Sequence, residues 1–191
     1  LREPDAWKEN SPTLIELGPT YVSTLETFPI TLPLIAGRST PVTVRPATLA
    51  DLDVLVRFSV AMARETEGRT LTLGRLRKGI RSVLESGEHG RYLVAESGAS
   101  VVGQLLLTYE WSDWRNGVFW WIQSVYVEPS ARRRGVYQTL HKHVVRDARE
   151  RGDVCGVRLY VEQDNRAAQA AYAGLGLTVT AYRIYEQDFV L

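Results

Sequence analysis

The sequence predicts an α/β (α+β) fold, in which a mixed, mostly antiparallel sheet of six or seven strands is flanked by about four helices. Residues 92–96 and 101–109 are rich in β-forming side chains and are joined by Ser-Gly-Ala-Ser, which is a hairpin signal. An apolar run from Phe119 leads through a helical pattern to another apolar run at 157–161, as in a βαβ crossover. The hairpin predicts antiparallel pairing early in the sheet, and the crossover predicts a parallel pair later.

The elements before the hairpin follow from short local signals. Residues 42–45 form an expected strand that stops at Pro46, and Thr48-x-x-Asp51 resembles a capping box with Asp in place of Glu. The helix that it opens is expected to run to about Arg64 and to break at the segment ETEG. Apolar spacing then predicts a second helix at about 72–85.

The elements after the hairpin are predicted in the same way. Residues 110–117 (EWSDWRNG) are expected to form a loop, and Gly152 is expected to end the helix that follows the apolar run from Phe119. Asn165 is expected to cap a short helix. Residues 177–182 and 183–191 are interpreted as closing strands.

The first 41 residues differ from the rest, because they hold six of the eight prolines. Such frequent prolines exclude a long helix or a central strand. The segment is nevertheless too apolar for a disordered linker. The sequence therefore predicts an extended arm at 1–41, lying against its own domain or against a second subunit, followed by one domain at 42–191.

Composition excludes several classes of function. A net charge of +1 argues against bulk binding to nucleic acid. The single Cys155 excludes an internal disulfide, and His141 and His143, two apart on a helix, do not face one metal ion. No apolar window is long enough to span a membrane, and no secretory signal is visible, so we expect a cytoplasmic protein without a metal site.

Phe119 to Val145 is the most informative stretch. It reads as a buried strand, then Arg132 to Arg134 and Gly135, then an amphipathic helix. A helix that begins after such a turn presents unpaired backbone N–H groups and the positive end of its dipole. This arrangement binds phosphate, so the stretch predicts a site for a ligand that carries a diphosphate.

Two motifs resemble those of the GNAT superfamily of acyl-CoA-dependent N-acetyltransferases. Arg132 to Tyr137 (RRRGVY) is similar to the family pattern [Q/R]-x-x-G-x-[G/A], with Tyr137 in place of the final small residue. The second family pattern is N-x-x-A-x-x-x-Y-x-x-x-G-[FL]. Its matches here are Asn165, Ala168, Tyr172, Gly176 and Leu177.

The resemblance implies a sheet splayed at its centre, acetyl-CoA as the acyl donor and a set of residues that bind it. The amides of the first motif would hold the pyrophosphate, the strand at 125–127 would align the pantetheine arm, and Tyr172 would be the general acid. The position of Tyr137 on its helix suggests that the tyrosine ring turns into the core. The implied cofactor-binding residues are Val125, Tyr126, Val127, Arg132, Arg133, Arg134, Gly135, Val136, Tyr137, Gln138, Asn165, Ala168 and Tyr172.

The acceptor amine must lose a proton to a carboxylate, directly or through water. Glu110 is the first candidate for this base and Glu65 the second. Rings and carboxylates in the segment EWSDWRNG could hold an ammonium, which predicts a small cationic amine as acceptor; a hydrophobic cap is the alternative for the tryptophans. The candidate substrate-binding residues are Glu65, Glu110, Trp111, Asp113, Trp114 and Glu162.

Other functions remain open at this stage. The chain could be a non-catalytic acyl-CoA-binding or regulatory module, since a fold does not fix chemistry. It could also acetylate protein or peptide N-termini or lysines. The resemblance favours a homodimer that uses the N-terminal arm, and the neutral overall charge disfavours nucleic acid as a partner.

Overall fold

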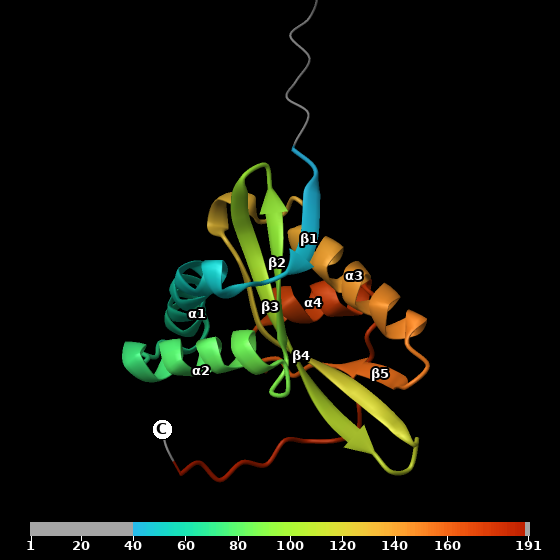
Figure 1. The fold of residues 1–191 in the computed structure, drawn as a ribbon. Helices are drawn as coiled ribbons and strands as arrows, with labels where there is room; N and C mark the ends of the chain where they lie inside the picture. The colour runs from blue at the N-terminus through green and yellow to red at the C-terminus, as the bar shows by residue number, and fades with distance from the viewer. Residues whose placement is uncertain (1–39, 190–191) are drawn as a thin grey trace, which may run out of the picture. The chain divides into compact units, whose positions relative to one another are not determined.

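A computed structural model describes residues 40–189, and it shows a five-stranded sheet of order β1-β2-β3-β4-β5 (Figure 1). Pairing is antiparallel from β1 to β4 and parallel between β4 and β5, as the sequence predicts. The strands are β1 Val42–Pro46, β2 Arg91–Ser97, β3 Ser100–Ser112, β4 Gly117–Val127 and β5 Val154–Arg158.

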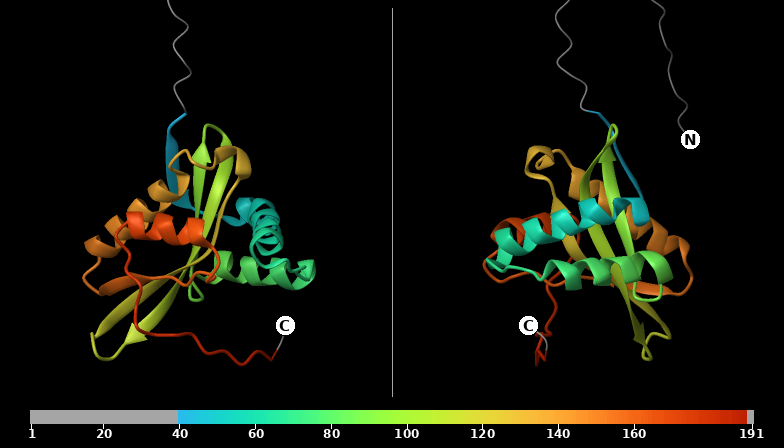
Figure 2. Two further views of the ribbon diagram at one scale, coloured as in Figure 1. Left: turned by 180° about the vertical axis from the view of Figure 1, so that it is seen from behind. Right: turned by 60° about the vertical axis from the view of Figure 1, so that its left-hand side comes forward.

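Four α-helices cover the two faces of the sheet. The first pair, α1 and α2, lies on one face, and α3 and α4 lie on the other (Figures 1 and 2). Short 3₁₀ turns at Leu49–Asp51 and Pro129–Ala131 precede α1 and α3. The helices are α1 Leu52–Glu67, α2 Leu73–Ser86, α3 Val136–Glu150 and α4 Arg166–Gly174.

Each face of the sheet has its own core. Between the sheet and α3, Leu140 and Val144 are completely buried against Trp120 and Ile122 of β4. On the other face, Leu55 of α1 and Ile80 of α2 pack on β2. The helical spacing of these apolar side chains thus fixes α3 and α1 on opposite sides of the sheet.

A bulge bends β4 away from β5. Pairing of the two strands ends at Trp121 and Arg158, although β4 continues to Val127. Ser124 has a φ of 49°, and the β3–β4 register shifts opposite it. The fully buried amide of Gln104 donates to the carbonyl oxygen of Ser124 at 3.2 Å, which fixes the bend. The predicted splay at the centre of the sheet is therefore present.

The described residues contain fewer strands than the six or seven predicted. Residues 177–189, interpreted as closing strands, have no regular secondary structure. Their large side chains face solvent, among them Val179, Tyr182 and Tyr185. A β-forming composition does not make a strand without a neighbour to pair with, which is why this prediction was wrong for the described residues.

Three predicted boundaries also shift. The first helix runs through ETEG to Glu67 and ends at Gly68, whose φ of 63° suits glycine. The expected loop at 110–117 shrinks to a turn at 113–116, because Glu110 and its neighbours continue the pairing with β4. The fifth strand begins three residues earlier than predicted, at Val154, because its pairing with β4 begins at Val118.

The predicted arm at 1–41 lies almost entirely outside the described residues. Within residues 40–189, no helix combines the length and the apolar composition that crossing a bilayer requires. No group of three or more metal-ligating side chains gathers in this part of the chain.

Candidate functional site

A cavity of about 550 Å³ lies between the beginning of α3 and one side of α4. Most of the first motif lines it, including Arg132 and Gly135, and so does Gln138, which follows the motif. The remaining lining residues are Val127, Ala131, Arg133, Val136, Tyr137, Ala167, Ala170, Ala171, Gly174 and Leu175.

The turn before α3 has the backbone geometry of an anion site. Arg133 has a φ of 60° and Gly135 a φ of 77°, so the chain turns sharply into the helix. Thr139 donates the first helical hydrogen bond, to the carbonyl oxygen of Gly135 at 2.9 Å. The amides of residues 136–138 therefore precede the helical ladder and are available to a ligand. Together with the side chain of Arg132, they fit the pyrophosphate of an acyl-CoA.

The edge of β4 that faces β5 is open next to this cavity. Beyond Trp121 this edge has no strand partner among residues 40–189. Val127, at its end, lines the cavity. An extended ligand can therefore hydrogen-bond to the backbone of residues 122–127, as the resemblance implies for the pantetheine arm at 125–127.

Small side chains on α4 form the opposite wall. Ala167, Ala170, Ala171 and Gly174 all line the cavity, and sequence reasoning did not identify them. Their spacing in RAAQAAYAG puts them on one face of the helix, and this pattern of small residues could have indicated the wall of a binding site. Asn165 caps this helix, as predicted, by accepting a hydrogen bond from the amide of Ala168 at 3.1 Å.

Tyr172, the predicted acid, packs edge-on against Tyr137 with ring centroids 5.4 Å apart. Burial raises the pKa of Tyr172, so its hydroxyl stays protonated at neutral pH. The Tyr137 ring also lies against His141, and its hydroxyl has no hydrogen-bond partner in the described part of the chain. Tyr137 thus fills the space between α3 and α4 and leaves the turn at Gly135 unobstructed.

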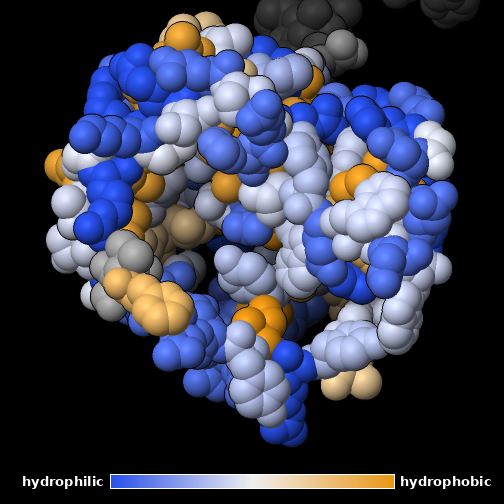
Figure 3. Space-filling model, turned by 60° about the horizontal axis from the view of Figure 1, so that its bottom comes forward, coloured by the Kyte–Doolittle hydropathy of each residue, from blue (hydrophilic) through white to orange (hydrophobic). Residues whose placement is uncertain are grey.

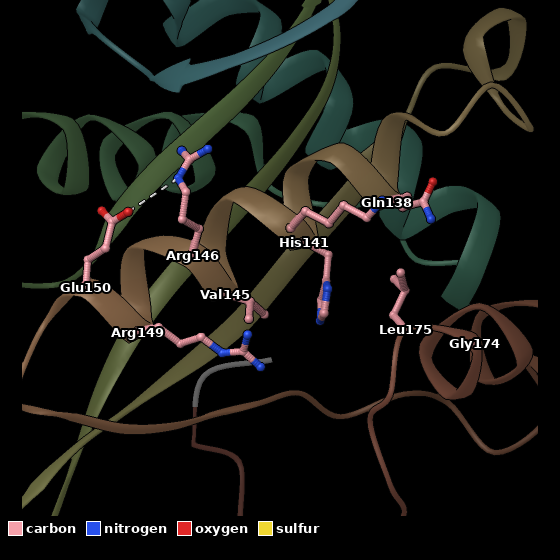
Figure 4. Close-up of a pocket in the computed structure, with 9 residues that line it drawn as sticks. Gln138, His141, Val145, Arg146, Arg149, Glu150, Gly174 and Leu175 are labelled. Atoms are coloured by element: carbon pink, nitrogen blue, oxygen red, sulfur yellow. Dashed lines mark ion pairs between the residues drawn. The ribbon is translucent and has the colours of Figure 1, made fainter. Parts of the chain in front are cut away.

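A second hollow, of about 640 Å³, continues along α3 (Figure 4). It shares Gln138, Gly174 and Leu175 with the first cavity, so the two are adjacent. Its walls carry Arg149 and the ion pair of Arg146 with Glu150, drawn in Figure 4. Of these two cavities, only the first includes the turn at Arg133 and Gly135.

Glu65 lies in the last turn of α1 and reaches the end of β4. One of its oxygens accepts a hydrogen bond from the hydroxyl of Tyr126 at 2.9 Å, and the other pairs with Arg132 at 2.5 Å. The hydrogen bond from Arg132 holds the pKa of Glu65 below its usual range. The predicted base and the predicted cofactor-binding arginine are therefore in direct contact.

Glu110 lies on the other side of the Ser124 bulge. Its carboxylate pairs with Arg158 of β5 and accepts the indole N–H of Trp121. The guanidinium of Arg158 also stacks on the ring of Phe119, 3.6 Å from its centroid. Sequence reasoning did not identify Arg158, since nothing local marks it as the partner of a residue in β3.

The other predicted acceptor residues do not form a cage. Trp111 and Trp114 are exposed and lie near the end of the β3–β4 hairpin. The face of the molecule turned to the viewer in Figure 3 is largely hydrophilic. No ring contact joins them within residues 40–189. Asp113 accepts the amide of Trp114 within the turn, and Glu162 accepts the amide of Asp164 at 2.7 Å.

Comparison with known proteins identifies the family of this chain. The sequence profile of the Acetyltransferase (GNAT) family matches residues 60–177. A possible acetyltransferase from Clostridium difficile 630, known from its crystal structure, is 39% identical in sequence to this chain. The two structures superpose with a TM-score of 0.73, and the match covers 78% of this chain and 99% of that one. No curated protein matches the sequence.

Two further crystal structures share the fold. A GCN5-related N-acetyltransferase from Ralstonia eutropha JMP134 is 26% identical, with a TM-score of 0.64 over 77% of this chain and 99% of that one. A "predicted acetyltransferase with acetyl-CoA" from Clostridium acetobutylicum is 18% identical, with a TM-score of 0.64 over 77% of this chain and 96% of that one. The family profile spans more than half of the sequence, and the chain belongs to the GNAT family of acetyltransferases.

Proposed function

We propose that the protein transfers an acetyl group from acetyl-CoA to a primary amine by direct attack within a ternary complex. The observation that carries the proposal is the cavity at the start of α3, where unpaired amides and Arg132 meet the open edge of β4. The similar acetyltransferase from Clostridium acetobutylicum, described with acetyl-CoA, supports the choice of donor.

The residues proposed as base and acid lie on opposite faces of the splayed sheet. The thioester supplies the electrophilic acetyl carbon when the donor is bound. A carboxylate on the α1 face, Glu110 or Glu65, would take the proton of the incoming ammonium, directly or through water. The amine nitrogen then bonds to the acetyl carbon and loses a second proton, and the carbon–sulfur bond breaks. Tyr172 gives its proton to sulfur and is reprotonated by the proton that leaves nitrogen. Burial raises the pKa of Tyr172, so its hydroxyl keeps the proton at neutral pH until sulfur needs it.

A small cationic amine is the proposed acceptor. Support comes from the acidic and aromatic side chains of the α1 face, where Glu110 lies beside Trp121 and the rings of Trp121 and Tyr160 are 6.2 Å apart. Arg158 pairs with the same carboxylate, so the two charges compensate each other. A surface with compensated charges does not strongly repel a cationic amine.

A screen of acceptor amines with acetyl-CoA, read by the release of free thiol, tests the proposal. The panel should include polyamines, amino acids, aminoglycosides and peptides with a free N-terminus or a lysine. Thiol release with at least one small amine is the expected result. Tight CoA binding without turnover on any amine would instead indicate a non-catalytic acyl-CoA-binding module. Turnover restricted to peptides would indicate a protein acetyltransferase.

A further inference from the structure

Arg132 is held in place before any ligand is present. Its Nε donates to the carbonyl oxygen of Val127 at 2.9 Å, and its Nη2 pairs with Glu65 at 2.5 Å. Its guanidinium carbon lies 5.5 Å from the centroid of the Tyr126 ring. The arginine thus has contacts to β4 and to α1 while its side chain lines the cofactor cavity.

Glu65 is itself fixed by buried structure. The Tyr126 hydroxyl donates to its second oxygen, and the ring of Tyr126 is buried against Phe58 of α1, with centroids 5.1 Å apart. A series of contacts therefore runs from the core of α1 through Tyr126 and Glu65 to Arg132. Both oxygens of the Glu65 carboxylate are in use, one by Tyr126 and the other by Arg132.

We infer that Glu65 is a positioning residue, which fixes Arg132 for the pyrophosphate of acyl-CoA; this inference rests on the proposed function. A long side chain that must be immobilised when its ligand arrives weakens binding by the entropy it loses. The contacts of Arg132 with Val127 and Glu65 remove part of that loss in advance. The inference leaves Glu110 as the carboxylate for proton transfer.

The geometry also opposes the alternative in which Glu65 competes with the phosphates. Competition would require Glu65 to occupy the donors that a phosphate needs, but Glu65 accepts only from Nη2, and Arg132 lines the cavity while it is paired. The contact of Arg132 Nε with Val127, at the cavity wall, directs the guanidinium to the same side as the pairing with Glu65 does.

A double-mutant cycle on equilibrium CoA binding, measured by calorimetry, tests the inference. Glu65→Ala should weaken CoA binding about fivefold, the factor that corresponds to a partly exposed ion pair. In the Arg132→Ala background the same change should alter binding less than about twofold, because the partner is gone. Glu67→Ala is the matched control, since Glu67 is two residues away and pairs with Arg69; it should bind CoA like the wild type.

The outcomes separate the inference from the proposed function. Tighter CoA binding by Glu65→Ala, or an equal loss in both backgrounds, would overturn the positioning role. Unchanged binding combined with a shifted pH profile of turnover in Glu65→Gln would overturn it too, since Glu65 would then be the base. Tyr126→Phe removes only the hydroxyl and should also weaken CoA binding, but by less than Glu65→Ala does. Unchanged CoA binding in this variant would also contradict the inference. Failure of the wild type to bind CoA would overturn the inference and the proposed function together.

Discussion

One Nη atom of Arg158 lies 3.0 and 3.1 Å from the two carboxylate oxygens of Glu110. The two residues belong to β5 and β3, so the ion pair crosses β4 at the last position where β4 and β5 are paired. Beyond it the two strands are no longer paired, and Val127, at the end of β4, lines the cavity at the start of α3. Glu110 therefore marks the boundary between the paired part of the sheet and the splayed part that holds the proposed site.

Replacing Glu110 with Gln should lower kcat about 100-fold and shift the pH profile of turnover, because an amide cannot accept the proton of an ammonium. Turnover measured from pH 6 to 10 with saturating acetyl-CoA checks this. Arg158→Lys keeps the positive charge and should cause a much smaller loss. A wild-type profile in Glu110→Gln would remove Glu110 as the base and transfer the role to Glu65.

Replacing Tyr172 with Phe should lower kcat at least about tenfold and change the affinity for acetyl-CoA less than about threefold. The ring keeps its contact with Tyr137, so only the proton donor is lost. Steady-state kinetics together with equilibrium CoA binding separate the two effects. Tyr182→Phe is the control, since this tyrosine is exposed and lies outside the site. An unchanged kcat would exclude Tyr172 as the acid.

Sequence alone could predict the local parts of the site. The turn before α3 and the Asn165 cap each depend on residues within a few positions of one another, so their motifs specify them. The resemblance to the GNAT family supplied the sheet splay and the donor, and the family profile confirms the resemblance.

The pairings between distant residues could not be predicted. Glu65 and Arg132 are 67 positions apart, and Glu110 and Arg158 are 48 apart. Such contacts depend on strand register, and a shift of one residue reverses the face that each side chain occupies. The wrong start of β5 shows the same difficulty, because its limits are set by pairing with β4 and not by its own composition.

Replacing Gly135 with Val should abolish the stabilisation that CoA gives to the protein. A Cβ at this position would meet only the side chain of Gln138, 3.7 Å away, so no clash arises. The cost comes from the φ of 77°, which is unfavourable for a β-branched residue by about 1–2 kcal/mol. The turn should change shape and misplace the unpaired amides. Thermal unfolding with and without CoA measures this, and Gly152→Ala, in open space, is the control.

A CoA-dependent rise in melting temperature that survives in Gly135→Val would contradict the assignment of the pyrophosphate site. A fall in the melting temperature of the ligand-free variant alone would not explain a lost CoA effect, because the comparison is made within each variant.

Replacing Ala171 with Leu should weaken CoA binding at least about tenfold, because the larger side chain enters the cofactor cavity. Stability should change little, since both residues are good helix formers. Ala173→Leu is a matched control: it lies on the same helix but does not line the cavity. Equal CoA affinity in the two variants, measured by calorimetry, would exclude this wall of α4 from the binding site.

Stability at low pH should depend on Asp51, which closes the capping box before α1. Its buried carboxylate accepts hydrogen bonds from Arg45 at 2.8 and 2.9 Å and from the amide of Thr48 at 2.8 Å. The hydrogen bonds from Arg45 hold the pKa of Asp51 below its usual range. A lowered pKa in the folded state stabilises the protein above the unfolded pKa of about 4, and this contribution is lost as the pH falls through the folded value.

Asp51→Asn should therefore reduce the free energy of unfolding by about 2 kcal/mol at pH 7, and the difference from the wild type should shrink as the pH falls below about 4. Urea unfolding at pH 7, 5 and 3 measures it. Asp53→Asn is the control, because the Asp53 side chain is 81% exposed and pairs with Arg77 only at the surface. Its effect should stay below about 0.5 kcal/mol at every pH. A constant difference for Asp51→Asn from pH 7 to 3 would show that the lost stability comes from packing and not from the carboxylate charge.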